Sequence, residues 1–311
     1  MGVFSLVYLP YRGVEYLEIG NRLQHLICIY IQFLYIFAIQ MPRYMSVSNW
    51  IQTLPPRGRY TFTKKDIETA LPEIKSHTLS IALSREISKK VVFSPWRGFY
   101  VIIPDAYKLR GIVEQSFYID ELMAYLNKAY YVSLLSAAAH YGAAHQKPMA
   151  FYVMTEPPIL RSKKTSNYIT YFTQRNYIPS QFVSRIAVPT GWRSYSSPEL
   201  TAVDLITYRH RIGGLDRAST VLAELTEKTD FSKLNADFLE TAPIATFQRL
   251  GYICEYVIEQ KKVADDIMCL IEKGEETMRT TPLKSNAKYS SCHINKRWKI
   301  IENFRIEIDD L

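Results

Sequence analysis

Basic side chains are concentrated in one short part of this 311-residue chain, between Arg57 and Arg97. The segment holds nine Lys and Arg residues against four Asp and Glu residues, so it carries +5 of the whole chain's net charge of +8. Cations grouped in this way bind nucleic-acid phosphates, because each contact releases condensed counterions. The charge pattern therefore predicts a binding site for double-stranded DNA. A solvated basic face on an ordinary small domain is the alternative.

The local sequence predicts helices that would present these charges. Thr63 and Asp66 have the spacing of a capping box, which begins a helix that Pro72 ends. A second helix begins at Ser76, and its apolar residues recur with helical period. The side of this second helix that faces the core is expected to contain Leu79, Leu83 and Ile87.

A hairpin is expected after the two helices. Residues 91–93 and 99–103 are rich in strand-forming residues, and the turn-forming cluster Ser94–Gly98 lies between them. An earlier helix is expected over residues 45–54. Helices followed by a hairpin in this order predict a winged helix-turn-helix DNA-binding domain over residues 45–104.

The outward side of the second helix would read the DNA. Its N-terminal half is expected to contact bases, with Ile81 against a thymine methyl group and Arg85 forked to guanine. Cations at the helix end and at the hairpin tip are expected to contact phosphates. Trp96 has two interpretations, as a wedge against DNA or as a ring folded back on the hairpin. The expected DNA-binding residues are Thr63, Lys64, Lys65, His77, Thr78, Ile81, Ser84, Arg85, Ser88, Lys89, Lys90, Trp96 and Arg97.

Sequence patterns typical of catalysis are missing. The chain has neither Gly-rich phosphate loop (GxxxxGKS/T or GxGxxG), no HExxH, no GxSxG and no cysteine with a credible histidine partner. His140 and His145 are five residues apart, one too many for two ligands on one helical face. We therefore expect a binding protein with no catalytic residue, metal or cofactor. The alternative is a DNA-targeted effector such as a nuclease, for which Glu259-Gln260-Lys261 has the E-x-K spacing.

Several separated motifs resemble the AbiEi-type antitoxins of bacterial type IV toxin–antitoxin and abortive-infection loci. The similarity runs from about residue 45 to the C-terminus, and its specificity comes from the order of the motifs rather than from any one of them. The motifs are Leu54–Thr63 (LPPRGRYTFT), Arg97–Pro104 (RGFYVIIP), Tyr130–Gln146 (YYVSLLSAAAHYGAAHQ), Pro198–Leu205 (PELTAVDL) and Gly213–Asp216 (GGLD).

The resemblance implies a DNA-binding antitoxin that represses its own operon and serves in phage defence. The neighbouring gene would encode a nucleotidyltransferase-like toxin. One expected partner is double-stranded DNA, as inverted repeats in the chain's own promoter. The other is this toxin, which the antitoxin counteracts either by direct contact or without it.

The first 44 residues do not conform to the rest of the chain. Leu23–Ile39 is an apolar run slightly shorter than the about 20 residues that span a bilayer. Acidic Glu15 and Glu18 in its flank fit a signal peptide poorly. We interpret residues 1–44 as translated upstream sequence before a true start at Met45, with a membrane anchor as the alternative. Together with four cysteines that lack CxxC spacing, this predicts a cytoplasmic protein without stable membrane association.

Residues 105–311 are expected to form the antitoxin domain, a mixed α/β domain with a helical C-terminal part, so that the whole chain is an α+β protein. Glu199 and Asp204 have two interpretations, a functional groove or local capping and pairing, and capping is favoured for Glu199 because acids stabilise a first helical turn. Helices are expected over 120–126, 131–141, 215–225, 236–240, 246–261 and from Pro198, and strands over 151–154, 168–172, 183–188 and 193–195.

Overall fold

The computed structural model describes residues 45–111, 113–143, 150–165, 168–188, 191–288 and 290–308. The expectations for residues 1–44, and the part of the Tyr130–Gln146 motif that includes His145, lie outside the described residues. The chain divides after Trp50 into two units, of which Ile51–Leu311 carries nearly all of the described elements. No helix in the described ranges is long and apolar enough to cross a membrane.

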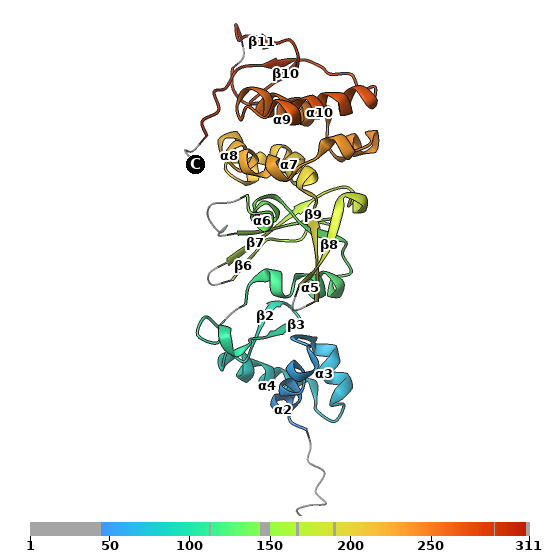
Figure 1. Ribbon diagram of the computed structural model, residues 1–311. Coiled ribbons are helices and arrows are strands. Elements are labelled where there is room, and N and C mark those ends of the chain that lie inside the picture. The colour runs from blue at the N-terminus through green and yellow to red at the C-terminus, as the bar shows by residue number, and fades with distance from the viewer. Residues whose placement is uncertain are drawn as a thin grey trace, which may run out of the picture. The chain divides into compact units, whose positions relative to one another are not determined.

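The N-terminal part contains three helices and a three-stranded antiparallel sheet of order β1-β3-β2 (Figure 1). The expected helices and hairpin are confirmed, whereas the three-residue strand β1 was not anticipated. A strand this short has no periodicity of its own, and it exists because it pairs with β3. The elements are α2 (Val47–Gln52), the 3₁₀ segment η1 (Pro55–Arg57), β1 (Thr61–Thr63), α3 (Lys64–Ala70), α4 (Ser76–Ser88), β2 (Val92–Trp96) and β3 (Phe99–Ile102).

The capping box at the start of α3 is confirmed. The Thr63 hydroxyl accepts a hydrogen bond from the Asp66 backbone N–H at 3.1 Å, and the Asp66 carboxylate accepts one from the Thr63 N–H at 2.6 Å. Arg59 adds an ion pair to the same carboxylate at 2.7 Å. Two otherwise unpaired helical donors are thereby satisfied, which fixes where α3 begins.

The core side of α4 differs from the expectation at one position. Leu79 and Leu83 are buried as expected, but Ile87 is 40 % exposed and Glu86 is buried in its place. At 100° per residue, position 86 returns to within about 20° of position 79, whereas position 87 lies about 80° away. The Glu86 carboxylate is paired with Lys89 at 3.1 Å, so the buried charge has a partner.

The second sheet has six strands in the order β6-β7-β5-β4-β9-β8. The expected strands are confirmed, but the helix expected from Tyr131 was wrong at its start. Tyr130–Val132 is a central strand, buried throughout, and the helix begins only at Leu134. The pairs β5–β7 and β4–β9 are parallel and the others antiparallel. The strands are β4 (Tyr130–Val132), β5 (Ala150–Thr155), β6 (Lys163–Thr165), β7 (Tyr168–Gln174), β8 (Val183–Val188) and β9 (Gly191–Ser196).

Helices cover this sheet and continue beyond it, so that the fold is mixed α+β. In Figure 1, α7 and α8 lie between the six-stranded sheet and the pair α9 and α10. The helix expected over 246–261 ends at Tyr256, and a separate helix follows it. The helices are α5 (Ile119–Tyr125), α6 (Leu134–His140), α7 (Pro198–Thr207), α8 (Leu215–Leu225), α9 (Ile244–Tyr256) and α10 (Lys261–Lys273).

Short segments complete the chain. Ser197 caps α7 by accepting from the Leu200 N–H at 3.2 Å, and Pro198 occupies its first turn, as expected. The small terminal strands are β10 (Thr281–Pro282), β11 (Ile294–Asn295) and β12 (Ile300–Ile301). The remaining 3₁₀ segments are η2 (Asp105–Tyr107), η3 (Gln115–Phe117), η4 (Ser180–Phe182), η5 (Arg209–Arg211), η6 (Thr226–Lys228), η7 (Phe231–Lys233) and η8 (Ala236–Thr241).

The hairpin β2–β3 shares a hydrophobic core with the six-stranded sheet. Phe93 of β2 meets Tyr118 edge to face, with ring centroids 5.5 Å apart. Phe99 of β3 packs against Tyr125 of α5 at 5.6 Å. One core therefore runs from the hairpin through α5 to the sheet, and the hairpin's inner face is not a free surface.

Candidate nucleic-acid interface

One side of α4 is exposed along its length and carries polar, cationic and apolar groups. Burial of Leu79, Leu83 and Glu86 fixes the orientation of the helix. Ile81, which is 42 % exposed, stands among polar neighbours on the outer side. This arrangement offers hydrogen-bond donors and a methyl contact within one helical face. The exposed residues on or next to it are His77, Thr78, Ile81, Ser84, Arg85, Ser88, Lys89 and Lys90.

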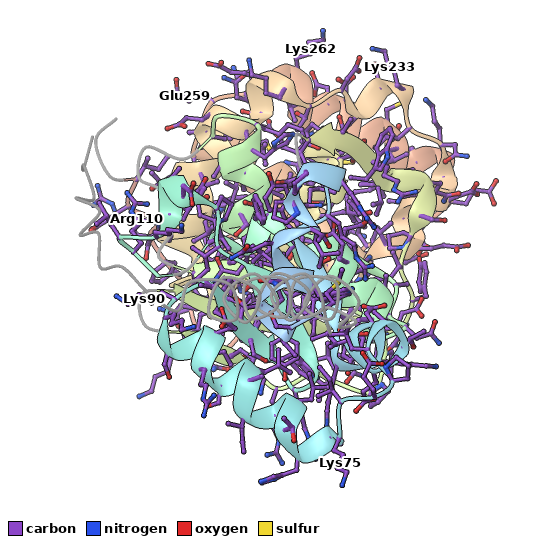
Figure 2. All side chains as sticks on the ribbon, turned by 90° about the horizontal axis from the view of Figure 1, so that it is seen from below. Lys75, Lys90, Arg110, Lys233, Glu259 and Lys262 are labelled. Carbon is purple, nitrogen blue, oxygen red and sulfur yellow. The ribbon has the colours of Figure 1, made fainter. Side chains whose placement is uncertain are left out.

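Several cations of this region have no anionic partner among the residues that the structure describes. In the described parts of the chain, neither Arg85 nor Lys90 makes an ion pair. Lys64, by contrast, lies 3.6 Å from Glu68 and donates to the Ser76 hydroxyl at 2.8 Å. Figure 2 shows Lys75 and Lys90 at the two ends of α4. Positive charge is therefore available at both ends of this helix.

Lys90 holds an unusual backbone position that ends α4. Its φ of 57° is left-handed, a conformation usually taken by glycine. The Val91 N–H donates to the Glu86 carbonyl at 3.0 Å and the Lys90 N–H donates to the Ile87 carbonyl at 2.9 Å. These are the two hydrogen bonds of a Schellman motif. A lysine at this place adds a cation beyond the helix end at some cost in backbone strain.

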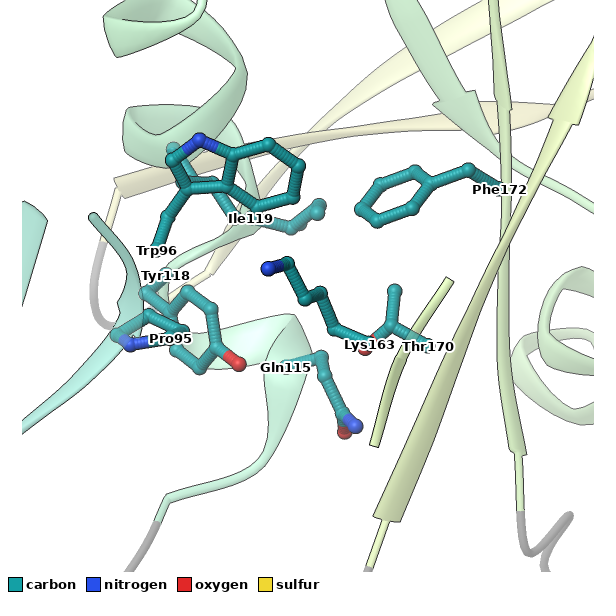
Figure 3. A pocket seen from close by; sticks show the side chains of 9 residues that line it. Pro95, Trp96, Gln115, Tyr118, Ile119, Lys163, Thr170 and Phe172 are labelled. Atoms are coloured by element: carbon teal, nitrogen blue, oxygen red, sulfur yellow. The ribbon is translucent and has the colours of Figure 1, made fainter. Parts of the chain in front are cut away.

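The tip of the hairpin points partly into the protein. Trp96 is half-buried, and its ring meets Phe172 of β7 edge to face at 6.2 Å. The Lys163 ammonium lies 4.6 Å from the centre of the Trp96 ring (Figure 3). The ring folds back into the protein, where it packs against Phe172 of β7. Arg97 remains exposed beside it, and its carbonyl accepts a hydrogen bond from the Tyr125 hydroxyl at 3.1 Å.

The cavity around Trp96 is too small for a ligand. It measures about 10 Å³, roughly the space of a single water molecule. Its walls come from the hairpin, from η3 and α5, and from the sheet (Figure 3). We interpret it as a packing gap in the contact between hairpin and sheet. The lining residues are Pro95, Trp96, Gln115, Tyr118, Ile119, Leu122, Lys163, Thr170 and Phe172.

The expected DNA-binding residues thus divide into those that are exposed and those that are engaged within the fold. Those of α4, together with Lys65, Lys89, Lys90 and Arg97, are exposed. Thr63 is engaged as the cap of α3, and Trp96 is engaged with Phe172. Lys64 is half-buried and paired. The exposed set is therefore the part of this region that is available to a ligand.

A buried polar cluster joins the six-stranded sheet to α7 and η8 and was not anticipated from the sequence. Arg175, just after β7, donates to the Asp204 carboxylate and to the Tyr131 hydroxyl at 2.8 and 2.9 Å. Tyr131 also donates to Asp204 at 2.8 Å, and Arg175 reaches the Thr241 carbonyl. Burial raises the pKa of Asp204 to about 6, and the Arg175 guanidinium beside it acts in the opposite direction by favouring the charged carboxylate. Asp204 therefore pairs with Arg175 and Tyr131, which come from other elements of the domain, and not within its own helix.

Glu199 also acts outside its own helix turn. It is buried, and its carboxylate accepts a hydrogen bond from the Asp230 backbone N–H at 2.8 Å. His140 stacks on Tyr195 with ring centroids 4.2 Å apart. Among the described residues, no group of three or more His, Cys, Asp and Glu side chains could hold a metal ion. Glu259 of the E-x-K set lies between α9 and α10, not on a strand.

Residues 131–256 match the model of the AbiEi antitoxin C-terminal domain. This part of the chain belongs to the AbiEi antitoxin family. The resemblance noted from the motifs is confirmed over these residues, and a role as the antitoxin of a toxin–antitoxin system is supported. The AbiEi domain contains Tyr131, Arg175 and Asp204, so the buried cluster is part of it.

A solved structure with a similar fold is the RV2827C protein from Mycobacterium tuberculosis. It superposes with a TM-score of 0.60 at 15 % identity, and the alignment covers 84 % of this chain and 94 % of that one. The similarity therefore extends beyond the AbiEi domain and concerns the fold alone. A comparison with curated proteins found no match.

Proposed function

We propose that residues 45–104 form a winged helix-turn-helix domain that binds double-stranded DNA, with α4 as the recognition helix. The observation that carries this proposal is the exposed, partly cationic side of α4, held outward by buried Leu79 and Leu83. The order of helices, short strand and hairpin supports it, because that order places a helix and a wing on one face.

The dimensions of α4 suit the major groove. Thirteen residues give a helix of about 20 Å, and the groove is about 12 Å wide. Ile81 and Arg85 are one helical turn apart, so they meet neighbouring base pairs. Ile81 contacts a thymine methyl group and Arg85 contacts a guanine. Lys90 and Arg97 lie outside the helix and contact phosphates, which fix register without reading sequence.

The AbiEi domain supports the second half of the proposal. The protein represses its own operon by binding inverted repeats in the promoter, and it counteracts a nucleotidyltransferase-like toxin from the same phage-defence locus. It acts in the cytoplasm as a binding protein and not as an enzyme.

The test uses the full chain and its own upstream DNA. Fluorescence anisotropy should show binding that weakens steeply with salt, because several counterions are released. A scrambled duplex of equal length is the control. Equal affinity for the upstream region and the scrambled duplex from low to moderate salt would contradict sequence-specific repression.

A variant can separate repression from toxin neutralisation. Reversing charge on the exposed side of α4, as in Arg85→Glu with Lys90→Glu, should abolish promoter binding while leaving the AbiEi domain intact. Co-expression with the neighbouring toxin then measures growth. Continued rescue by the variant assigns neutralisation to the AbiEi domain, whereas loss of rescue would tie protection to DNA binding.

A further inference from the structure

The turn Lys108–Gly111, called the connector turn below, exposes a leucine between two cations. Leu109 is 97 % exposed. Burying a leucine is worth about 1.5–3 kcal/mol, so a side chain this open gains nothing from the fold it belongs to. Lys108 and Arg110 flank it in sequence. A fully exposed leucine between two cations suits a partner that carries negative charge on its outside and apolar groups inside.

The connector turn has a defined backbone. The Arg110 and Gly111 N–H groups both donate to the Tyr107 carbonyl at 3.0 Å, and Gly111 has a φ of 70°. Tyr107 in turn packs on Phe117, with ring centroids 6.4 Å apart. Phe117 also meets Tyr60, which precedes β1, at 5.4 Å. The turn is therefore anchored to the part of the protein that carries α4.

The connector turn also touches the end of α4 directly. A Cβ built on Gly111 would lie 3.1 Å from Cδ and 3.4 Å from Cε of Lys90. The stem of Lys90 thus lies close to the backbone of the turn at Gly111. Figure 2 shows Lys90 and Arg110 projecting on the same side of the molecule.

The two cations of the turn differ in whether they have an anionic partner. Lys108 is paired with Asp105 at 2.6 Å. Arg110 makes no ion pair within the residues that the structure describes. Arg110 and Lys90 therefore offer adjacent cations next to the C-terminal end of α4, and Leu109 stands beside them.

We infer that the connector turn is a second DNA-binding element, which enters the minor groove beside the site where α4 occupies the major groove. Arginine is attracted into a narrow A·T-rich minor groove, and apolar side chains such as leucine wedge between base steps there. Arg110 supplies the cation and Leu109 the wedge. Lys90 contacts the phosphate between the two grooves. This inference rests on the proposed function of α4.

Three synthetic duplexes distinguish the grooves. Alternating d(AT), d(IC) and d(GC) hairpins of equal length serve as probes for the full-length protein. An inosine–cytosine pair keeps the major-groove groups of G·C but lacks the minor-groove amino group, so it resembles A·T in the minor groove. If the contact lies in the minor groove, the affinity for d(IC) should be close to the affinity for d(AT). If the contact lies in the major groove, the affinity for d(IC) should be close to the affinity for d(GC).

The variants are Arg110→Ala, Leu109→Ala and Arg110→Lys. Each of the first two should weaken binding to d(AT) and d(IC) about tenfold, as expected for one lost specific contact, and change d(GC) binding less than about twofold. Arg110→Lys should leave the salt dependence of binding unchanged but lose part of the preference for d(AT) and d(IC) over d(GC). Lys262→Ala, which removes an exposed cation of α10, is the matched control and should change none of these affinities.

The possible failures are distinguishable. An equal loss on all three duplexes would show that Arg110 only holds phosphate and would overturn the minor-groove assignment. Unchanged affinity in both Arg110→Ala and Leu109→Ala would show that the turn does not contact DNA. Absence of binding by the unaltered protein to every duplex at low salt would instead contradict the proposed function of α4.

Discussion

Two arginines of this chain show two different uses of the same side chain. Arg85 on α4 is exposed and has no ion pair among the described residues. Arg175 in the AbiEi domain is 7 % exposed, and its donors are occupied by Asp204, Tyr131 and the Thr241 carbonyl. A guanidinium with free donors can recognise a ligand, whereas one with satisfied donors holds the fold.

The same contrast extends to other cations. Arg193 is fully buried and donates to the carbonyls of Ser116 and Phe117. Arg249 donates to the Pro282 carbonyl at 2.9 Å, and burial lowers its pKa to about 10. Net charge alone therefore overstates the positive surface of the AbiEi domain. Arg175, Arg193 and Arg249 are thus occupied within the fold, whereas Arg85 on α4 is exposed, which supports the proposal that DNA binds to the N-terminal part.

The largest expected effect tests whether the two regions are separable. Ending the chain after Pro104 would expose Phe93, Phe99 and Val101, which now share a core with the sheet. Each such side chain loses about 1.5–3 kcal/mol of burial, and the sum rivals the stability of a whole domain. We expect residues 45–104 alone to lack a cooperative thermal transition in circular dichroism. A sharp transition with full DNA affinity would show that the region is independent.

A smaller effect is expected from breaking the buried cluster. Asp204→Asn should destabilise the protein by about 3–5 kcal/mol, because Arg175 would be left as an unpaired buried charge. Replacing both, as in Arg175→Met with Asp204→Leu, should recover much of that loss. Urea denaturation measures both free energies of unfolding. A loss below about 1 kcal/mol for Asp204→Asn would mean that Arg175 finds another partner or water.

The exposed arginine should behave in the opposite way. Arg85→Ala should leave the free energy of unfolding within about 0.5 kcal/mol but cost about 1–3 kcal/mol in discrimination between the promoter and a scrambled duplex. Arg85→Lys keeps the charge and loses the forked geometry, so it serves as the matched variant. A uniform loss on both duplexes would reassign Arg85 to phosphate contact.

The smallest effect separates strain from binding at Lys90. Lys90→Gly relieves the left-handed backbone but makes the unfolded chain more flexible, so we expect a net gain of about 0.5 kcal/mol in stability. The same change removes a phosphate contact, so the salt slope of DNA binding should fall by about 1. Thermal melting and anisotropy at several salt concentrations check the two parts. An unchanged slope would exclude Lys90 from the interface.

Local sequence was sufficient where an element is specified by its own residues. The capping box of Thr63 and Asp66 and the Pro198 start of α7 were predictable, because each depends on side chains within one helical turn. The outward positions of Ile81 and Arg85 followed from the helical period. The family was also evident from the motifs, since those segments are read in order along the chain.

Pairing between distant segments was not predictable from one sequence. Tyr131 and Val132 were taken for the start of a helix because so short an apolar run has no decisive period. They belong to the strand Tyr130–Val132 because β5 and β9 flank it. The exchange of Ile87 for Glu86 on the core side of α4 has a different cause: the expectation followed side-chain polarity, whereas the helical period places position 86 nearer to Leu79.

The sequence by itself determined the basic segment, the helices that carry it and the absence of a familiar catalytic pattern. Only the tertiary structure decided which cations are available to a ligand. Arg85 and Arg175 are indistinguishable as letters, but Arg175 meets Tyr131 and Asp204 from segments 44 and 29 residues away. Whether a charge binds or stabilises depends on whether the folded chain already satisfies it, and that is fixed by contacts between residues far apart in the sequence.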